Sequence, residues 1–424
     1  MIPATLALAA AAGCGKPRER KPPDPPTVML APLGALRGSA LPHLRADGGG
    51  VVLSWTEPAA DGAHALRWAR LGPRGWSSPH TVTQGRDWLL NWADFPSVTA
   101  LGGSRMLAHW LTELPGGGYG ISLVASADGG STWSAPWSPH RDGTATEHGF
   151  VSVVPRGAGG AVLVWLDGRA FDGLDGATAE QRAAMALRAT SLDVAALDAA
   201  AAVSEGGAAG APGEAAAAPG DGELEVDPRT CSCCQTAAVA VGEDVVVAYR
   251  DRDVNEIRDI SVVRLESSGW TQPHAAHRDG WRIEGCPVNG PALAADGSRV
   301  ALAWFTEADD RAAVKLALSE DGGRTFGAPV RIDEGAPQGR VGVALVGARA
   351  AVSWQERNGQ RVELRLRVVQ AGKLGPARVI ASLPMGRLSG FPQLARFGEE
   401  LVLAWTAGDE RGQTQVQTAR LPLE

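Results

Sequence analysis

Four cysteines carry the most distinctive chemistry in this sequence of 424 residues. Three stand together at Cys231, Cys233 and Cys234, and the fourth is Cys286. In an exported chain they would most simply form disulfides. Neighbouring Cys233 and Cys234 would bond each other only with strain, so each should seek Cys231 or Cys286. The alternatives are free thiols or a thiolate site for Cu or Zn, with His148 as a further ligand, because soft sulfur ligands suit both metals. No cofactor is certain.

A second group of residues with chemical potential is charged or polar and flanks short apolar runs. Arg169, Arg250 and Arg340 could grip a carboxylate in planar, bidentate contacts. Asp94 or Asp251 could serve as a general acid or base, which completes the set of candidate catalytic residues. The candidate ligand-binding residues are Glu147, His148, Asp167, Arg169, Gln235, Arg250, Asp251, Arg252, Glu256, Arg258, Asp259 and Asn289. The alternative is a solvated face on which these charges pair with one another.

The elements that must position these residues recur along the chain. Seven short β-rich runs each end in an aromatic residue, namely Trp55, Trp110, Trp165, Tyr249, Trp304, Trp354 and Trp405. Neighbouring members are 50 to 55 residues apart, except for an interval of 84 residues before Tyr249. A period of this length, built from short strands, is typical of a propeller whose sheets pack around a common axis. The sequence therefore predicts an all-β propeller with seven blades, or six if one unit is degenerate.

Each unit is expected to form four strands joined by Gly-rich turns. The last unit supplies only three, so a strand within residues 27–33 is expected to complete it and close the ring. In such a ring, the loops that lead into the innermost strands share one face with the loops between second and third strands. The cysteines and the candidate ligand-binding residues belong to these loops. We therefore expect them to surround the mouth of the central channel.

Two segments match the pattern S-x-D-x-G-x-x-W/F of an Asp box, each between a third and a fourth strand. The aspartate would accept local backbone N–H groups, the glycine permits left-handed backbone, and the aromatic residue packs between sheets. Their residues are Ser126, Asp128, Gly130, Trp133, Ser319, Asp321, Gly323 and Phe326. With these boxes and repeats, the chain resembles the BNR/Asp-box family of sialidase-like propellers. Its residues 231–236 resemble those of a bacterial lipoprotein subgroup with a Cys-x-Cys-Cys segment.

The resemblance implies structural Asp boxes on the face opposite the active site. It also suggests sialidase chemistry, in which a tyrosine nucleophile works with a glutamate, an acid/base aspartate and three arginines. The sequence has only two tyrosines. Tyr119 lies in a Gly-rich hairpin, and Tyr249 fills the aromatic position of its unit, where a packing role is expected. A Phe-Arg-Ile-Pro segment is absent before the first unit. Sialidase activity is therefore the alternative and not the preferred function.

The N-terminus predicts export and a lipid anchor. Residues 2–12 are apolar but too few to span a bilayer as a helix, and the following Gly13-Cys14 resembles the end of a lipobox. The predicted organisation is a signal peptide over residues 1–14 with Cys14 as lipid anchor, a flexible tether over 15–26 and a propeller over 27–424. Residues 199–222, rich in Ala, Gly and Pro, are predicted to be a disordered loop.

Charge and composition limit the classes of partner that this protein could bind. A formal net charge of −7 gives no basic surface for nucleic acid. We expect a monomer in the bacterial cell envelope, periplasmic or cell-surface, that touches the membrane only through its N-terminal lipid. The preferred function is binding of a glycan, peptide, small molecule or metal at the channel mouth. One alternative is an exo-alpha-sialidase-type hydrolase acting on acidic sugars, and the other is an envelope protein that handles copper or zinc through the cysteines.

Overall fold

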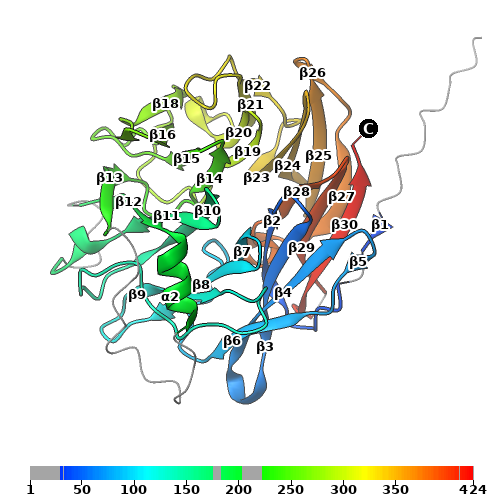
Figure 1. Ribbon diagram of the computed structural model, residues 1–424. Coiled ribbons are helices and arrows are strands. Elements are labelled where there is room, and N and C mark those ends of the chain that lie inside the picture. The colour runs from blue at the N-terminus through cyan, green and yellow to red at the C-terminus, as the bar shows by residue number, and fades with distance from the viewer. Residues whose placement is uncertain (1–28, 32, 175–182, 203–221, 410, 424) are drawn as a thin grey trace, which may run out of the picture.

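The structure is a computed structural model that describes residues 29–31, 33–174, 183–202, 222–409 and 411–423. Within these residues the strands form seven antiparallel sheets, the blades of a propeller. Figure 1 shows the blades arranged around a common axis, with the innermost strand of each blade toward the centre. The prediction of a seven-bladed all-β propeller is confirmed.

The blades share one strand order, from the axis outward. The innermost strands are β2 (Ala40–Ala46), β7 (Ser97–Gly102), β10 (His148–Arg156), β14 (Ala237–Val241), β19 (Ala292–Asp296), β23 (Pro337–Val346) and β28 (Gln393–Phe397). The second strands are β3 (Val51–Pro58), β8 (Arg105–Glu113), β11 (Gly160–Asp167), β15 (Asp244–Arg250), β20 (Arg299–Thr306), β24 (Arg349–Asn358) and β29 (Glu400–Gly408). The third strands are β4 (His64–Gly72), β9 (Tyr119–Ser126), β12 (Met185–Leu192), β16 (Ile260–Glu266), β21 (Ala313–Ser319), β25 (Arg361–Gln370) and β30 (Thr414–Pro422).

The outer edges are shorter and less regular. They are formed by β5 (Gly75–Trp76), β6 (His80–Gly85), β13 (Leu224–Thr230), β17 (Gly269–Trp270), β18 (His274–His277), β22 (Val330–Arg331), β26 (Lys373–Leu374) and β27 (Arg378–Leu383). In the second blade, the outer edge is formed by isolated bridges, one of which joins Leu123 and Trp137. Short, interrupted edges expose few unpaired backbone groups to other chains.

The ring closes through the N-terminal strand, as the sequence predicts. Strand β1 (Met29–Leu30) pairs with β30, with Met29 opposite Arg420 and Leu30 opposite Ala419. The last blade therefore combines both ends of the described chain, which Figure 1 shows side by side. This pairing covers the edge that β30 would otherwise expose.

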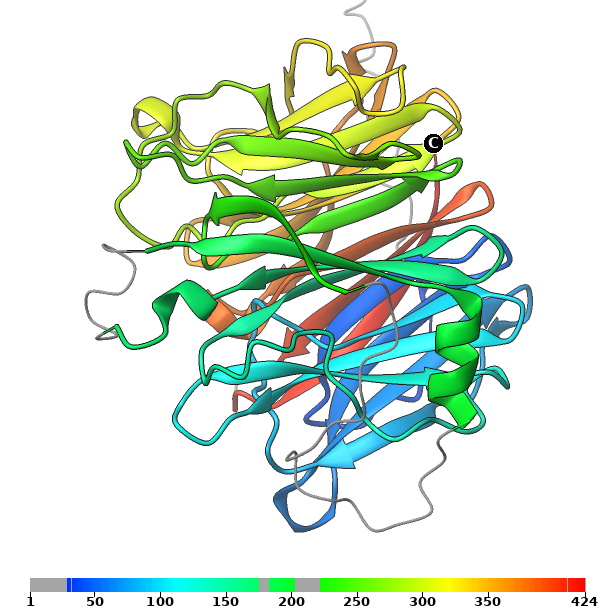
Figure 2. The same ribbon diagram turned by 60° about the vertical axis from the view of Figure 1, so that its left-hand side comes forward.

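The helical segments are short. They are α2 (Val194–Ala202) and the 3-10 turns η1 (Ala60–Gly62), η2 (Arg169–Phe171), η3 (Ala308–Asp310) and η4 (Gly386–Ser389). Helix α2 packs beside β9, where Asp198 accepts hydrogen bonds of 2.8 Å from Arg105 (Figure 2). It includes residues 199–202, so this start of the predicted loop is helical, while residues 203–221 lie outside the described residues. Among the described helices, none has the length and apolarity that a membrane span needs.

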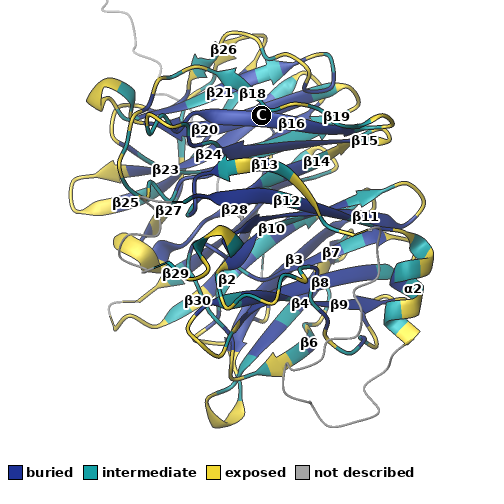
Figure 3. Cartoon of the chain, turned by 90° about the vertical axis from the view of Figure 1, so that its left-hand side faces the viewer, coloured by how far each residue is buried: buried dark blue, intermediate teal, exposed yellow. Residues whose placement is uncertain are grey.

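The core consists of apolar layers between neighbouring blades. The recurring aromatic residues all lie on second strands, and Figure 3 shows these strands as largely buried. A buried indole N–H needs an acceptor, and carboxylates supply it. Trp55 donates to Glu57 at 2.8 Å, and Trp165 donates to Asp167 at 2.9 Å. Tyr249 is 1% exposed, which agrees with its predicted packing role.

Both Asp-box segments form the same turn. Asp128 Oδ1 accepts the backbone N–H groups of Ser131 and Thr132 at 3.0 and 2.9 Å, and Asp321 does the same for Arg324 and Thr325. Each turn lies beside the hairpin between a first and a second strand, as the bond from Gly129 N to Ser104 O shows. The boxes are therefore at the end of the blades opposite the loops with the candidate site residues.

The Asp boxes give the first testable prediction. Asp128→Ala is expected to lower the free energy of unfolding by about 1 kcal/mol, because it removes a local acceptor of backbone N–H groups, comparable to a helix cap. Chemical denaturation measures this loss. The exposed Asp87 on the opposite end of the second blade is the control, and Asp87→Ala should change the stability by less than about 0.5 kcal/mol. Equal stabilities of the two variants would contradict a structural role for the box.

Candidate functional site

The loops that carry the candidate residues meet at one end of the blades, as predicted. Gly168, after a second strand, donates its backbone N–H to the carbonyl of Glu147, before an innermost strand, at 2.8 Å. In the next blade, Cys231 N donates to Arg250 O at 3.0 Å. The cysteine segment and the loop after Arg250 are therefore neighbours, and Arg258 of that loop reaches Cys231 Sγ at 3.3 Å.

The cysteines form a compact cluster. The Sγ atom of Cys231 lies 3.8 Å from that of Cys233 and 3.3 Å from that of Cys234, and no disulfide links them. Cys286, on the loop before β19, interacts through its thiol with Cys233. Burial opposes ionisation of Cys231. The thiols of Cys233 and Cys234 and the Arg258 guanidinium outweigh it and lower the pKa of Cys231 well below its usual value. The disulfide and metal hypotheses both remain predictions.

A network of ion pairs occupies the loops of the second and third blades. Arg169 Nε contacts Asp167 at 2.7 Å, and Arg169 Nη2 contacts Glu223 at 2.6 Å and Asp142 at 3.2 Å. His148 Nε2 lies 2.9 Å from Asp142 and 3.7 Å from Asp167. Burial opposes the charge on His148, but the bond to Asp142 prevails and raises the pKa of this histidine. His148, Asp167 and Arg169 therefore stabilise one another.

Several other candidates direct their polar groups at the backbone. Arg250 is 1% exposed and donates to the carbonyls of Asn289, Arg258 and Phe305 at 2.9, 2.6 and 2.7 Å. Its guanidinium also lies 4.7 Å from the centre of the Trp281 ring.

Polar side chains also bond to backbone groups at other junctions between blades. Asn289 accepts the backbone N–H of Arg340 at 2.8 Å, and Asp259 accepts those of Gly280 and Trp281 at 2.9 and 3.1 Å. Gln235 donates to the carbonyl of Ala93 at 2.5 Å and accepts from Gly290 N at 3.1 Å. These side chains hold neighbouring blades together.

Arg340, Arg252 and Asp251 are also engaged. Arg340 Nη1 donates to Ser389 Oγ at 2.5 Å, and its guanidinium stacks 4.6 Å from the centre of the Trp92 ring. Arg252 Nη2 contacts Glu256 at 2.7 Å, and Glu256 also pairs with Arg258. Asp251 accepts from Ser261 Oγ at 2.8 Å, while burial raises its pKa to about 6.

Three residues at the channel mouth, Asp94, Tyr119 and Glu147, here called the mouth site, combine two carboxyl groups with a phenol. Tyr119 and Glu147 pair through a β-bridge. Gly149 lies between Asp94 and Tyr119, where an added Cβ atom would stand 2.1 Å from Asp94 Oδ2 and 3.0 Å from the Tyr119 ring. Glycine is thus required for the close approach of these two side chains. Glu147 is exposed, whereas Asp94 is 3% exposed.

The mouth site has an unusual protonation pattern. Burial raises the pKa of Asp94 to about 7, the hydrogen bond from Phe150 N opposes this rise, and the nearby Glu147 adds to it. Burial and then the charges of Asp94 and Glu147 also raise the pKa of Tyr119. Near neutral pH, Asp94 is therefore able to exchange a proton, and Tyr119 stays protonated.

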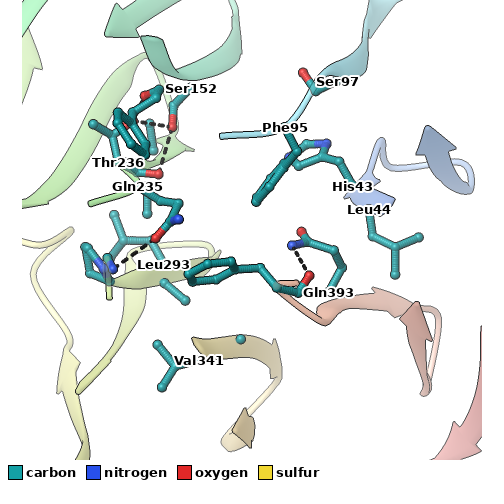
Figure 4. Close-up of a pocket in the computed structure, with 18 of the residues that line it drawn as sticks. His43, Leu44, Phe95, Ser97, Ser152, Gln235, Thr236, Leu293, Val341 and Gln393 are labelled. Carbon is teal, nitrogen blue, oxygen red and sulfur yellow. Dashed lines mark hydrogen bonds between the residues drawn. The ribbon is translucent and has the colours of Figure 1, made fainter. Parts of the chain in front are cut away.

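Asp94 also borders a cavity of about 180 Å³ on the axis of the propeller. Figure 4 shows side chains from blades all around the ring, including His43, Ser152, Leu293 and Gln393, facing this space. Of the other predicted site residues, Gln235 also lines the cavity. The mouth site therefore adjoins this cavity through Asp94.

Sequence reasoning missed Tyr119, His140, Asp142 and Glu223. The rings of His140 and His148 stack with centres 3.9 Å apart, and Asp142 lies between their polar atoms and Arg169. The close spacing of His140 and Asp142 in the loop before β10, and of His148 at the start of that strand, is a signal that could have indicated this cluster. Tyr119 gave no such signal, because its partner Glu147 is distant in sequence and approaches only through the bridge between blades.

Comparison with known proteins adds information on the fold. No family model matches the sequence, and no curated protein matches it. An ulvan lyase structure with bound GlcA(1-4)Rha3S has a TM-score of 0.56 at 10% identity, and the match covers 91% of this chain and 95% of the lyase. The polysaccharide lyase Uly1 has a TM-score of 0.51 at 9% identity, with 90% and 89% covered. Trypanosoma rangeli sialidase has a TM-score of 0.47 at 12% identity; 82% of this chain spans 56% of that protein. The chain is thus similar in fold to polysaccharide lyases, with sialidases also among its structural neighbours.

Proposed function

We propose that this chain is a bacterial envelope protein, anchored through a lipid on Cys14, that binds a carbohydrate at its channel mouth. The observation that carries the proposal is the mouth site, where Asp94 borders the axial cavity and lies close to Tyr119 and Glu147. The anchor rests on the sequence alone, since Cys14 lies outside the described residues.

The chemistry of the mouth site suits a sugar. An ionised carboxylate accepts hydrogen bonds from sugar hydroxyl groups, and a protonated carboxyl or phenol donates one. Glu147 is exposed and supplies the acceptor, while Asp94 and Tyr119 supply donors near neutral pH. The ulvan lyase of similar fold was solved with an oligosaccharide, which makes this ligand class a reasonable choice for the first tests.

Binding to a panel of neutral, uronic acid-containing and sulfated polysaccharides tests the proposal. For the polysaccharide that binds, Glu147→Gln should weaken the affinity by about tenfold or more, because a hydrogen bond to a charged group is lost. Glu243→Gln is the matched control, since Glu243 is also exposed but lies in the hairpin between β14 and β15, at the opposite end of the blades. Absence of binding across the panel, or equal affinities of Glu147→Gln and the wild type, would contradict the proposal.

A second candidate function is cleavage of a glycosidic bond. The raised pKa of Asp94, about 7, is the specific observation in its favour, because a general acid must hold its proton near the working pH. The sialidase version of this function gains less support. Its proposed arginines Arg169, Arg250 and Arg340 contact carboxylates or backbone carbonyls of the protein itself.

The same polysaccharide panel separates binding from cleavage. Release of reducing or unsaturated ends from a bound polysaccharide, lost in Asp94→Asn, would establish an enzyme. Binding without any chain shortening would support the carbohydrate-binding function.

A further inference from the structure

The thiol cluster is a second site that the proposed function does not use. Cys231 and Cys234 are 0% and 1% exposed, whereas Cys233 is partly exposed and Cys286 is exposed. The cluster therefore has a buried side against the protein and an open side toward solvent. Such an arrangement permits a small ion to enter without unfolding of the loop.

The spacing of the sulfur atoms matches that of ligands around one ion. A tetrahedral centre with metal–sulfur bonds of about 2.3 Å separates its sulfur atoms by about 3.8 Å. Cys231 Sγ is 3.8 Å from Cys233 Sγ and 3.3 Å from Cys234 Sγ, and the three sulfur atoms all lie within 4.8 Å of one another. Only small shifts of rotatable side chains would equalise these distances.

We propose that Cys231, Cys233 and Cys234, with Cys286 as the fourth thiol, bind one thiophilic d10 ion, either Zn(II) or Cu(I). Thiolate sulfur is the ligand type that both ions prefer. On binding, each sulfur gives a lone pair to the ion and its proton passes to solvent, so no oxidant or reductant is needed. This site does not depend on the carbohydrate proposal.

The surroundings fit a site with excess negative charge. Four thiolates around Zn(II) or Cu(I) leave a net negative centre, which a buried location tolerates only beside positive groups. Arg258 is 2% exposed and its Nη1 donates to Cys231 Sγ at 3.3 Å. Arg250, which is equally buried, bonds to the carbonyl of Arg258 and thereby fixes this segment. Outer hydrogen bonds of this kind orient metal ligands.

Metal titration of the full chain in a Cys14→Ser background tests the proposal, since only the four clustered thiols then remain. Reduced protein should bind one equivalent of Cd(II) with a thiolate charge-transfer band in the ultraviolet. Competition with chromophoric chelators for Zn(II) and for Cu(I) then identifies the preferred ion. Cys233→Ser should weaken binding by more than about 100-fold, which exceeds the usual effect of losing an outer-shell partner.

Two further variants keep the test decisive. Cys286→Ser alters an exposed side chain, so it should fold normally and still weaken binding. His140→Gln changes the other cluster of metal-binding residue types on this face, and it should bind the ion as the wild type does. Absence of the charge-transfer band in reduced protein, or loss of binding in His140→Gln alone, would overturn the proposal. So would disulfides that persist in protein isolated without oxidant and leave no titratable thiol.

Discussion

Arg250→Ala is expected to lower the free energy of unfolding by about 3 to 5 kcal/mol, because it leaves three buried carbonyl groups without their donor. It also removes the stacking of the guanidinium on Trp281. The three carbonyls belong to Asn289, Arg258 and Phe305, in different loops and strands, so the loss affects the junction between the fourth and fifth blades. Unfolding in urea, monitored through tryptophan fluorescence, measures this loss of stability.

A matched control is Arg282→Ala in the same region. Arg282 pairs with Glu284 at 3.2 Å, but both side chains are largely exposed, so this pair should contribute less than about 1 kcal/mol. If Arg250→Ala instead unfolded like the wild type and lost only carbohydrate binding, the arginine would contact ligand and the structural assignment would be wrong.

Arg250 also illustrates how far the sequence could predict this molecule. The interval between aromatic residues predicted the propeller, because a repeated core position leaves a periodic trace in the sequence. The closing strand followed from a missing fourth strand in the last unit, and β1 fills that position. The loop geometry then placed Arg250 correctly on the channel-mouth face. Its role depends on carbonyl groups of its own loop and of the adjacent blade, and backbone acceptors leave no trace in the residue types.

The mouth site shows the same limit of prediction from the sequence. The sequence indicates Asp94, because carboxyl groups in such loops are candidates for acid–base chemistry. It indicates no role for Tyr119 beyond its hairpin, yet Gly149 allows Tyr119 to approach Asp94. A glycine that accommodates two side chains from the neighbouring blade is indistinguishable in sequence from a glycine in a turn. Contacts between blades therefore have to come from the structure.

Asp94→Asn is expected to remove a large pH dependence of stability. The folded pKa of Asp94 is about 7, against 3.8 for the ordinary carboxyl, so the folded state holds this proton more tightly than the unfolded state does. Below about pH 4 Asp94 is protonated in both the folded and the unfolded state, and its contribution to the free energy of unfolding is at its maximum. Between about pH 4 and pH 7 the unfolded state loses its proton first, and the contribution falls with rising pH by about 4 kcal/mol. Above about pH 7 the contribution of Asp94 to the free energy of unfolding stays constant.

The measurement is the difference in free energy of unfolding between wild type and Asp94→Asn at several pH values, in which the titration of other groups largely cancels. Glu147 and Tyr119 face Asp94, and the variant leaves both in place. Asp128→Ala provides a comparison of opposite sign, since hydrogen bonds from Thr132 lower the pKa of Asp128 to about 2 and its contribution is lost as pH falls. A pH-independent difference for Asp94→Asn would show that the carboxyl is ionised and solvated in the folded protein. The mouth site would then have no protonated carboxyl group at neutral pH, and the capacity of Asp94 for acid catalysis would be lost.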